Sequence, residues 1–143
     1  MPYTPVLDLG YEGSRLKIAF EPDEDEPDWF RARFMVEAYP WGGVVEATLT
    51  RDDLLAFAQD LRTARLPRKL VLGGGRAAEL ILDLSVQLGQ NHGRIAMVAE
   101  LAQSGDDPYP FIRWLIYNVS PDFGPVEAGA IEALVRSSAP PST

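Results

Sequence analysis

Two glutamates, Glu37 and Glu46, come closest in this chain to the residue types and spacing that acid–base catalysis requires. They belong to two segments of alternating hydrophobicity joined by a turn, so a hairpin can set them opposite or diagonal to each other on one face of a sheet. Paired carboxylates can share general-acid and general-base roles in hydrolysis or isomerisation. Two solvated strand glutamates, each near Arg31 or Arg33, are the alternative, and the pattern favours it.

The other residue types that carry catalysis are sparse. His92 is the single histidine and sits between Asn91 and Gly93 in a predicted turn, which excludes a His–His metal site and leaves a Ser–His–Asp unit unsupported. No serine lies in the G-x-S-x-G motif of a nucleophile elbow, and the chain has no cysteine for thiolate catalysis or zinc binding. We therefore predict no catalytic residue, no metal site and no cofactor.

Two loop segments have partial ion-binding patterns. Residues 73–76, Gly-Gly-Gly-Arg, could point amides at a phosphate, but they lack the G-K-[ST] of a P-loop and the G-x-G-x-x-G of a dinucleotide-binding turn. Asp23 and Asp25 have the spacing of calcium ligands, but Pro27 and a missing glycine break the EF-hand pattern. We interpret the first segment as a flexible connector and expect no specific cation site at the second.

The most distinctive segment is 21–28, Glu-Pro-Asp-Glu-Asp-Glu-Pro-Asp, with six carboxylates and two prolines in eight residues. So much like charge with so few apolar groups predicts an exposed loop. Carboxylates steer a basic partner, and aromatic side chains anchor interfaces, while a merely solubilising loop is the alternative. The residues predicted to bind a partner protein are Asp23, Glu24, Asp25, Glu26, Asp28, Trp29 and Trp41.

The overall charge separates the classes of partner. The 143 residues include 13 Lys and Arg and 21 Asp and Glu, a net charge of -8, which opposes binding to a phosphate backbone. No run approaches the ~18 apolar residues of a membrane helix, and residues 1–10 lack the features of a signal peptide. We expect a cytoplasmic protein with no nucleic-acid or membrane partner.

A local basic patch interrupts this acidic composition. Residues 61–78 contain no acidic side chain. We expect the patch to pair with the acidic loop, with anion binding as the alternative. Its members are Arg62, Arg65, Arg68, Lys69 and Arg76.

The elements that position these residues follow from the hydrophobic period. Residues 40–43, Pro-Trp-Gly-Gly, predict the turn of a hairpin. Residues 111–119, apolar on both faces, predict a strand in the middle of a sheet. Alternation predicts further strands at 14–20, 29–39, 44–49, 80–88 and 95–101, with short ones at 5–9 and 70–72.

Two segments have helical periodicity. Thr50 can cap the first helix by accepting the amide of Asp53, between the flanking apolar residues Leu49 and Leu54. Pro125 suits the first position of the second helix. The stripes expected to face the core are Leu54, Phe57, Ala58 and Leu61 in the first helix and Val126, Ala130, Ile131, Leu134 and Val135 in the second.

The order strands, helix, strands, helix lacks the βαβ rhythm of a parallel sheet and predicts an α+β fold. We expect a mainly antiparallel sheet of about six to seven strands with two helices packed on it. Residues 1–136 are expected to form a single domain and residues 137–143 a flexible C-terminal tail.

Three segments carry a family resemblance. They are WFRARFMVEAYPWGGVVEATLTRDDLLAFAQDL, AAELILDLSVQLGQNHGRIAMVAEL and PFIRWLIYNVSPDFGPVEAGAIEALV, which together span Trp29 to Val135. Their layout of hairpin, capped helix, second hairpin, strand and helix resembles the WapI-type immunity proteins of bacterial polymorphic-toxin systems and their uncharacterised relatives. The resemblance implies a non-enzymatic protein that occludes a cognate toxin, often a nuclease with a basic surface. No functional residue is carried over from the family.

The sequence as a whole therefore favours a non-enzymatic, acidic protein-binding module, with a basic toxin domain as the partner that the resemblance implies. A small enzyme built on the carboxylate pair Glu37 and Glu46 is one alternative. A structural module that associates with itself through a sheet edge is the other, and the oligomeric state stays open.

Overall fold

The computed structural model describes residues 3–11, 13–63, 68–73, 78–84, 95–103, 111–119 and 124–138. Strands and helices follow one another in the predicted order, which confirms the α+β class. The predicted turn at His92, residues 74–76 of the connector and the end of the predicted strand 80–88 lie outside the described residues. The elements are β1 (Thr4–Tyr11), β2 (Ser14–Pro22), β3 (Trp29–Ala38), β4 (Trp41–Thr50), α1 (Arg51–Thr63), β5 (Arg68–Leu72), β6 (Ala78–Leu84), β7 (Ile95–Gln103), β8 (Phe111–Val119) and α2 (Pro125–Ser137).

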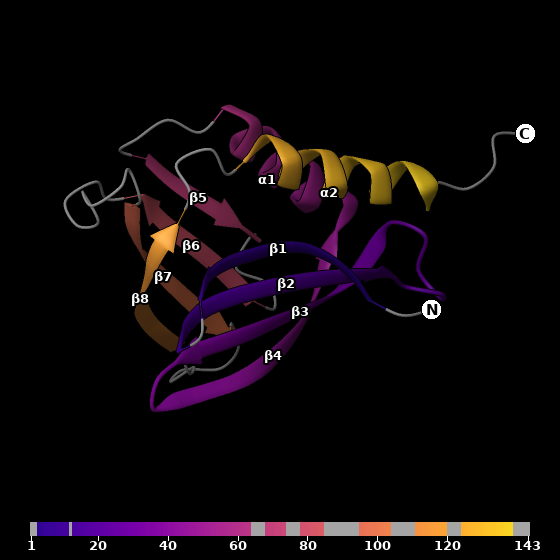
Figure 1. The fold of residues 1–143 in the computed structure, drawn as a ribbon. Coiled ribbons are helices and arrows are strands. Elements are labelled where there is room, and N and C mark those ends of the chain that lie inside the picture. Colours follow the sequence, from indigo (N-terminus) through magenta and orange to yellow (C-terminus); the bar gives the residue numbers. More distant parts are fainter. Residues whose placement is uncertain are drawn as a thin grey trace, which may run out of the picture.

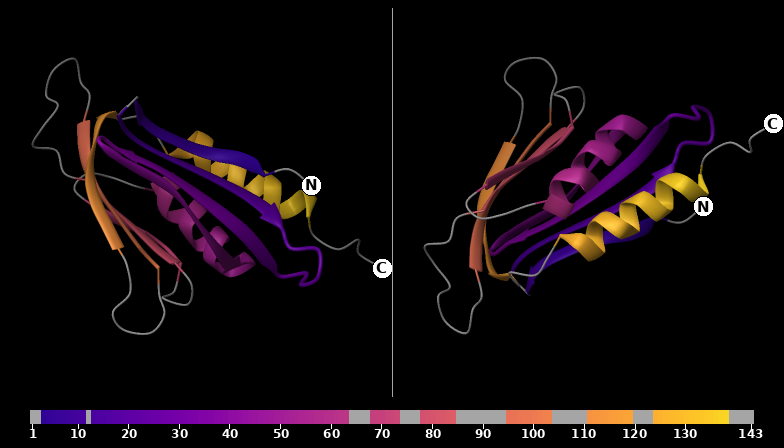
Figure 2. Two further views of the ribbon diagram at one scale, coloured as in Figure 1. Left: turned by 90° about the horizontal axis from the view of Figure 1, so that it is seen from below. Right: turned by 90° about the horizontal axis from the view of Figure 1, so that it is seen from above.

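The strands form two four-stranded antiparallel sheets, in the orders β1-β2-β3-β4 and β5-β6-β7-β8. The expectation of one sheet with six to seven strands is wrong. The helix α1 separates the two sets of strands in the chain, and β4 and β5 do not pair with each other. Each set is a meander in which every strand pairs with its neighbour in sequence. Figure 2 shows the second sheet standing across one end of the first.

The inner face of the first sheet forms the main part of the core. The predicted alternation is confirmed, because every second residue of β2 and β3 is buried. The helices α1 and α2 lie side by side over this sheet, and β8 contacts β1 and β2 (Figure 1). The side chains that fill the face include Leu16, Ile18, Phe20, Phe30, Ala32, Phe34 and Val36.

The sequence predicted that β8 lies in the middle of a sheet. This prediction is wrong, because β8 is the edge strand of the second sheet. Its two faces differ, because Trp114 and Ile116 are buried whereas Arg113 and Leu115 are exposed. The first sheet packs beside this strand, and the Ser14 hydroxyl donates a hydrogen bond of 2.6 Å to the carbonyl oxygen of Leu115. A strand that is apolar on both faces can therefore still be an edge strand when another sheet packs against it.

The first helix begins as predicted. The Asp53 amide donates to Thr50 Oγ1 at 3.1 Å, and the Thr50 amide donates to Asp53 Oδ2 at 3.0 Å. This reciprocal pair satisfies two backbone donors that the first turn of a helix otherwise leaves open. The predicted stripe of Leu54, Phe57, Ala58 and Leu61 is buried.

The second helix buries most of the predicted stripe, since Ile131 and Val135 are buried and Ala130 and Leu134 are partly buried against the core, but the prediction is wrong at Val126. Val126 is 80% exposed, whereas Ala128, Ile131 and Val135 are buried. Val126 lies in the first turn of α2, where Ala128 is the buried residue instead. The helix also continues through residue 137, which was predicted to begin the tail.

Arg62 is the one residue of the basic patch whose side chain the structure describes, and it does not pair with the acidic loop. Arg62 forms an ion pair with Glu132, which joins α1 to α2. Arg65 and Arg76 lie outside the described residues, and Arg68 and Lys69 begin β5. At Arg62, helix packing supplies a nearer carboxylate than the loop does.

The hairpin of β1 and β2 depends on a glycine near the end of β1. Gly10 has a φ of +89°, a conformation that costs other residues about 1–3 kcal/mol. A Cβ at this position would collide with the carbonyl oxygen of Ser14 and lie 2.6 Å from Cγ2 of Ile116 in β8. Gly10 therefore permits the close approach of the β1–β2 hairpin to the second sheet.

We predict that Gly10→Ala lowers the free energy of unfolding by about 2–4 kcal/mol, because backbone strain and steric overlap add at one site. Urea unfolding followed by far-UV circular dichroism measures the change. Gly43→Ala is the matched control, since a Cβ at Gly43 has no atom within 4 Å. Equal stability of the two variants would contradict the assigned contact.

Candidate partner-binding site

The acidic segment begins with a buried residue. Glu21 and Pro22 belong to β2, and Glu21 is only 6% exposed, so the prediction of an exposed loop is wrong at this residue. Its carboxylate lies 2.7 Å from Nη2 of Arg31, the residue directly opposite on β3. A carboxylate in so little water needs such a partner. The solvent-accessible charge of the segment therefore begins at Asp23.

The loop that follows is closed by its own backbone. The Asp23 amide donates to the Trp29 carbonyl at 3.0 Å, and the Trp29 amide donates to the Glu26 carbonyl at 3.1 Å. Asp23 Oδ1 accepts a hydrogen bond from the Asp25 amide at 2.9 Å. Glu24, Asp25 and Glu26 are exposed at the tip of this closed turn. The fold thus presents their carboxylates on a defined backbone.

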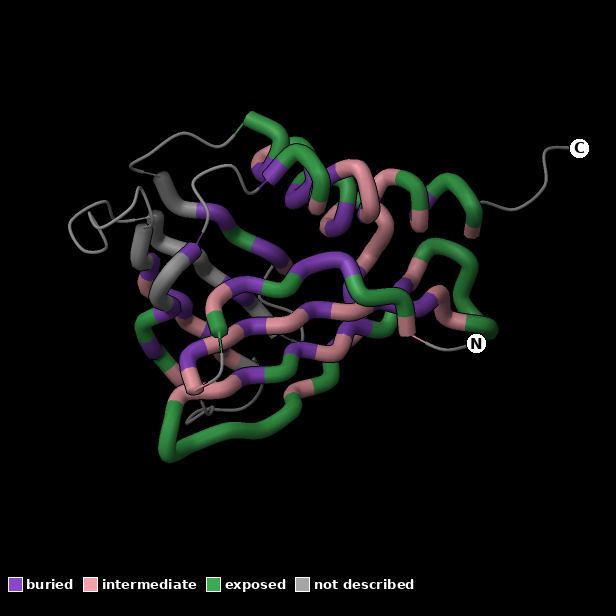
Figure 3. The backbone as a smooth tube through the Cα atoms, viewed as in Figure 1, coloured by how far each residue is buried: buried purple, intermediate pink, exposed green. Residues whose placement is uncertain are grey.

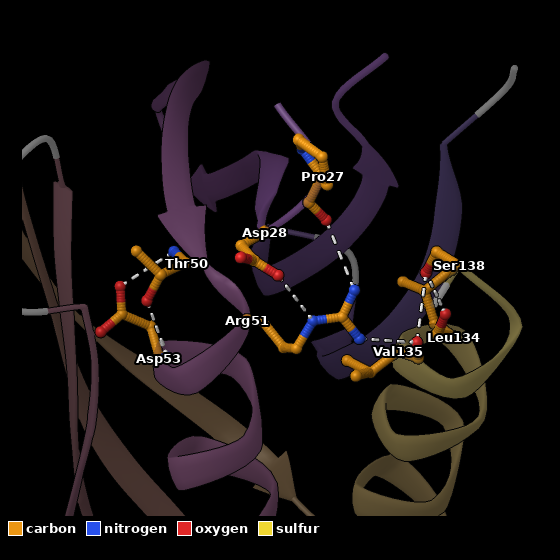
Figure 4. Close-up of polar contacts among 8 residues, drawn as sticks. All are labelled: Pro27, Asp28, Thr50, Arg51, Asp53, Leu134, Val135 and Ser138. Carbon is orange, nitrogen blue, oxygen red and sulfur yellow. Dashed lines mark hydrogen bonds and ion pairs between the residues drawn. The ribbon is translucent and has the colours of Figure 1, made fainter. Parts of the chain in front are cut away.

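Arg51, the first residue of α1, connects this loop to both helices (Figure 4). Its Nε lies 3.4 Å from Asp28 Oδ1, and its Nη2 lies 3.4 Å from the Pro27 carbonyl oxygen. Its Nη1 donates at 3.1 Å to the carbonyl of Val135 in the last turn of α2. A cation at this position also complements the negative end of the α2 dipole. The Arg51 side chain is 19% exposed and its bond to Val135 is partly buried, whereas its contacts with Asp28 and Pro27 face the solvent.

The loop and the first turn of α1 together form one surface, which we call the acidic end. The Arg51 amide donates to the Asp28 carbonyl at 2.9 Å, which brings the two segments together. A hollow of about 380 Å³ between them is lined by residues of both, including Asp28 and Asp52. The sequence did not indicate that Asp52 and Asp53 join this surface. The carboxylates of the acidic end are Asp23, Glu24, Asp25, Glu26, Asp28, Asp52 and Asp53.

The two predicted tryptophans do not lie together. Trp29 begins β3 opposite Thr50, beside the acidic end, and is half-buried. Trp41 begins β4 opposite Ala38, at the other end of the hairpin, and is 74% exposed. Nine residues of strand separate these ends, or roughly 30 Å. The predicted set of binding residues is therefore split between two ends of the first sheet (Figure 1).

The predicted carboxylate pair is not formed. The hairpin turns at Tyr39 and Pro40, so Trp41, Gly42 and Gly43 belong to the strand and not to the turn. This register sets Glu37 opposite Gly42 and Glu46 opposite Arg33. The two glutamates are therefore roughly 14 Å apart along the sheet, too far to act on one bond.

Each of these glutamates has another contact. Glu37 Oε2 accepts a hydrogen bond from the Gly13 amide at 3.1 Å, which ties the β1–β2 turn to β3. Glu46 Oε1 lies 3.2 Å from Nη2 of Arg33. For Glu46, this confirms the alternative prediction of a solvated strand glutamate near an arginine. Arg33 also stacks on the ring of Tyr3, with its Cζ 4.2 Å from the ring centroid. These contacts are structural.

The described residues include no metal-binding cluster and no membrane-spanning helix. No group of three or more His, Cys, Asp or Glu side chains in that part of the chain could hold a metal ion. Neither α1 nor α2, the helices that the structure describes, is long and apolar enough to cross a membrane.

Comparison with known proteins adds no relative. No protein-family model, curated protein or solved structure matches this chain. The charge, burial and contacts of its own residues therefore carry the functional argument.

We predict that Arg51→Ala lowers the free energy of unfolding by about 1–3 kcal/mol, because the carbonyl of Val135 keeps only the longer bond of 3.5 Å from the Ser138 hydroxyl and the loop loses its anchor to α1. Urea unfolding measures the stability, and hydrogen exchange at the Asp23 and Trp29 amides reports loop closure. Arg51→Lys should give an intermediate loss, since it keeps the charge without the planar fork. Arg136→Ala, an exposed arginine in the same turn of α2 as Val135, is the control. The anchor role is excluded if Arg51→Ala and Arg136→Ala are equally stable.

Proposed function

We propose that this protein is a non-enzymatic protein-binding module that captures a basic partner protein at its acidic end. One observation carries the proposal. Across residues 23–29 and 50–53, seven carboxylates accompany a single cation, Arg51. Arg51 is engaged by Asp28 and by two backbone carbonyls, so it neutralises Asp28 and leaves the other six carboxylates of the acidic end unbalanced.

The spacing of these charges suits electrostatic attraction. Interactions between exposed charges are screened over about 8 Å at physiological salt, so carboxylates must be clustered to act together. A two-residue step such as that from Glu24 to Glu26 covers about 7 Å at most. A field of this kind raises the rate of association with an oppositely charged protein by ~10- to 1,000-fold.

The backbone of the acidic end is already ordered before a partner arrives. Hydrogen bonds close the loop between Asp23 and Trp29, and Arg51 holds its second half against α1. Binding to a surface that is already ordered avoids part of the entropy cost of association. The half-buried Trp29 lies at the edge of this surface and can supply apolar contact.

The biological role that fits this surface is that of an immunity protein that neutralises a cognate toxin by covering its basic active surface. The net charge of -8 supports this role, as does the resemblance of residues 29–135 to WapI-type immunity proteins. Occlusion requires shape and charge and no reacting group in the inhibitor itself. The partner is thus expected to be a protein domain with a basic face.

We predict that neutralising the tip of the loop slows capture of this partner by at least about tenfold at low salt, because the steering field is lost. The variant carries Asp23→Asn, Glu24→Gln, Asp25→Asn and Glu26→Gln. The amide side chains keep the acceptor on which the loop turn depends. The probe is the protein encoded beside this chain's own gene, and the measurement is its association rate at low and at physiological salt.

The control removes the same number of charges elsewhere, with Asp8→Asn, Glu46→Gln, Asp60→Asn and Glu100→Gln. We expect it to retain the association rate within about threefold, since these residues lie away from the acidic end. Thermal unfolding confirms that both variants are folded. An equal decrease of the association rate in the two variants would mean that only the net charge matters. An unchanged association rate in the loop variant would refute the proposed site.

A further inference from the structure

The strand β4 is an edge strand of the first sheet. Among the described strands it pairs only with β3, and its register with β3 is unbroken from Trp41 to Thr50. Natural proteins protect such edges with lysines, prolines, bulges or short strands. The stretch Trp41–Val45 contains none of these devices. This half of β4 is exposed along the lower rim of the molecule (Figure 3).

The open half of β4 is apolar, and we call it, together with Tyr39, the hairpin tip. Tyr39 is 86% exposed, Trp41 74% and Val44 51%, values that are high for large apolar side chains. A groove of about 490 Å³ runs beside the strand. Its lining is Val36, Trp41, Gly42, Gly43, Val44, Val45 and Ile112.

The hairpin tip has an exposed side chain, Trp41, and an empty space above Gly43 on the same strand. Trp41 and Gly43 are two residues apart on β4, so they belong to the same face of the sheet. A Cβ at Gly43 would have no atom within 4 Å, which leaves open space above the strand. A surface that carries both a projection and a recess can bind its own copy through a two-fold axis.

We propose that a second copy of this chain binds at the hairpin tip by antiparallel pairing of the two β4 edges, with Gly43 facing Gly43 of the second copy. In this register Trp41 lies opposite Val45 of the other copy and diagonal to its Gly43. The indole then covers the recess in the other copy, and the reverse contact is equivalent by symmetry. The first sheet becomes an eight-stranded sheet across the dimer, and both β4 edges are covered.

The distribution of charge favours a second copy over a basic partner at this surface. Of the two carboxylates nearby in the described part of the chain, Glu46 is paired with Arg33 and Glu37 binds the Gly13 amide. The acidic end lies roughly 30 Å away along the strands. In the dimer the two acidic ends point away from each other, at a separation of several screening lengths of about 8 Å. The net charge of each copy therefore opposes association only weakly.

The dimer goes beyond the proposed function and does not depend on it. Pairing at the hairpin tip covers Trp41 and Val44 and leaves both acidic ends free. Loss of dimerisation and loss of partner capture should thus follow from different substitutions. This separation allows either proposal to fail alone.

The experiment is sedimentation velocity of the full chain over a broad concentration series. We expect a monomer–dimer equilibrium that Trp41→Ala and Val44→Lys each weaken at least about tenfold. Both side chains are largely exposed, so the variants should fold, and circular dichroism checks this. Val126→Lys, at an 80% exposed apolar residue of α2, is the matched control and should dimerise as the original chain does.

Crosslinking tests the register. The chain has no cysteine, so Gly43→Cys introduces a single thiol that should oxidise to a disulfide-linked dimer through the two-fold axis. Glu24→Cys, at the acidic end, is the control and should crosslink at least about tenfold more slowly. The proposal is overturned if the original chain is monomeric at every concentration. Binding of an apolar peptide to the groove would not rescue it, because the proposed occupant is a second copy of the chain. It is equally overturned if the dimer survives both Trp41→Ala and Val44→Lys, because another surface then forms it.

Discussion

The buried inner face of the first sheet is the contact on which the other layers depend. Phe20, Phe30 and Phe34 come from β2 and β3 and are fully buried under the helices and the second sheet. Each such side chain contributes about 1.5–3 kcal/mol when it leaves water. Because this face uses every second residue, the opposite face and the two strand ends remain available for charged and exposed groups. Both surfaces with a proposed role lie at these ends.

Local patterns in the sequence predicted the features that depend on local physics. The alternation in β2 and β3, the Thr50–Asp53 cap and the buried stripe of α1 are confirmed, because each is set by residues within a few positions of one another. The division into two sheets was not predicted, since strand pairing joins distant segments and no local signal states which edges meet. The edge position of β8 was missed for the same reason: the packing of the β1–β2 hairpin against β8 is invisible in the sequence of β8 alone.

The candidate site shows how one turn decides a functional interpretation. A turn at residues 40–43 would bring Glu37 opposite Glu46, whereas the observed turn at Tyr39 and Pro40 brings Glu37 opposite Gly42. A shift of four positions in the pairing thus removes the only catalytic arrangement that the sequence had indicated. Trp29 and Trp41 are close in sequence, but they lie at opposite ends of the same hairpin. The acidic loop was predicted from composition, which needs no register, and its exposed tip is confirmed.

The anchoring of the acidic loop has a consequence for how its recognition can evolve. Backbone groups at Asp23, Glu26 and Trp29 close the loop, and Arg51 fastens its second half to the helices. The side chains of Glu24 and Glu26 take no part in these bonds, so replacing them costs the fold little. Under the proposed function, binding preference and folding stability are therefore encoded in separate residues of one short segment. Successive substitutions at its tip could redirect the protein to a new partner while the scaffold stays unchanged.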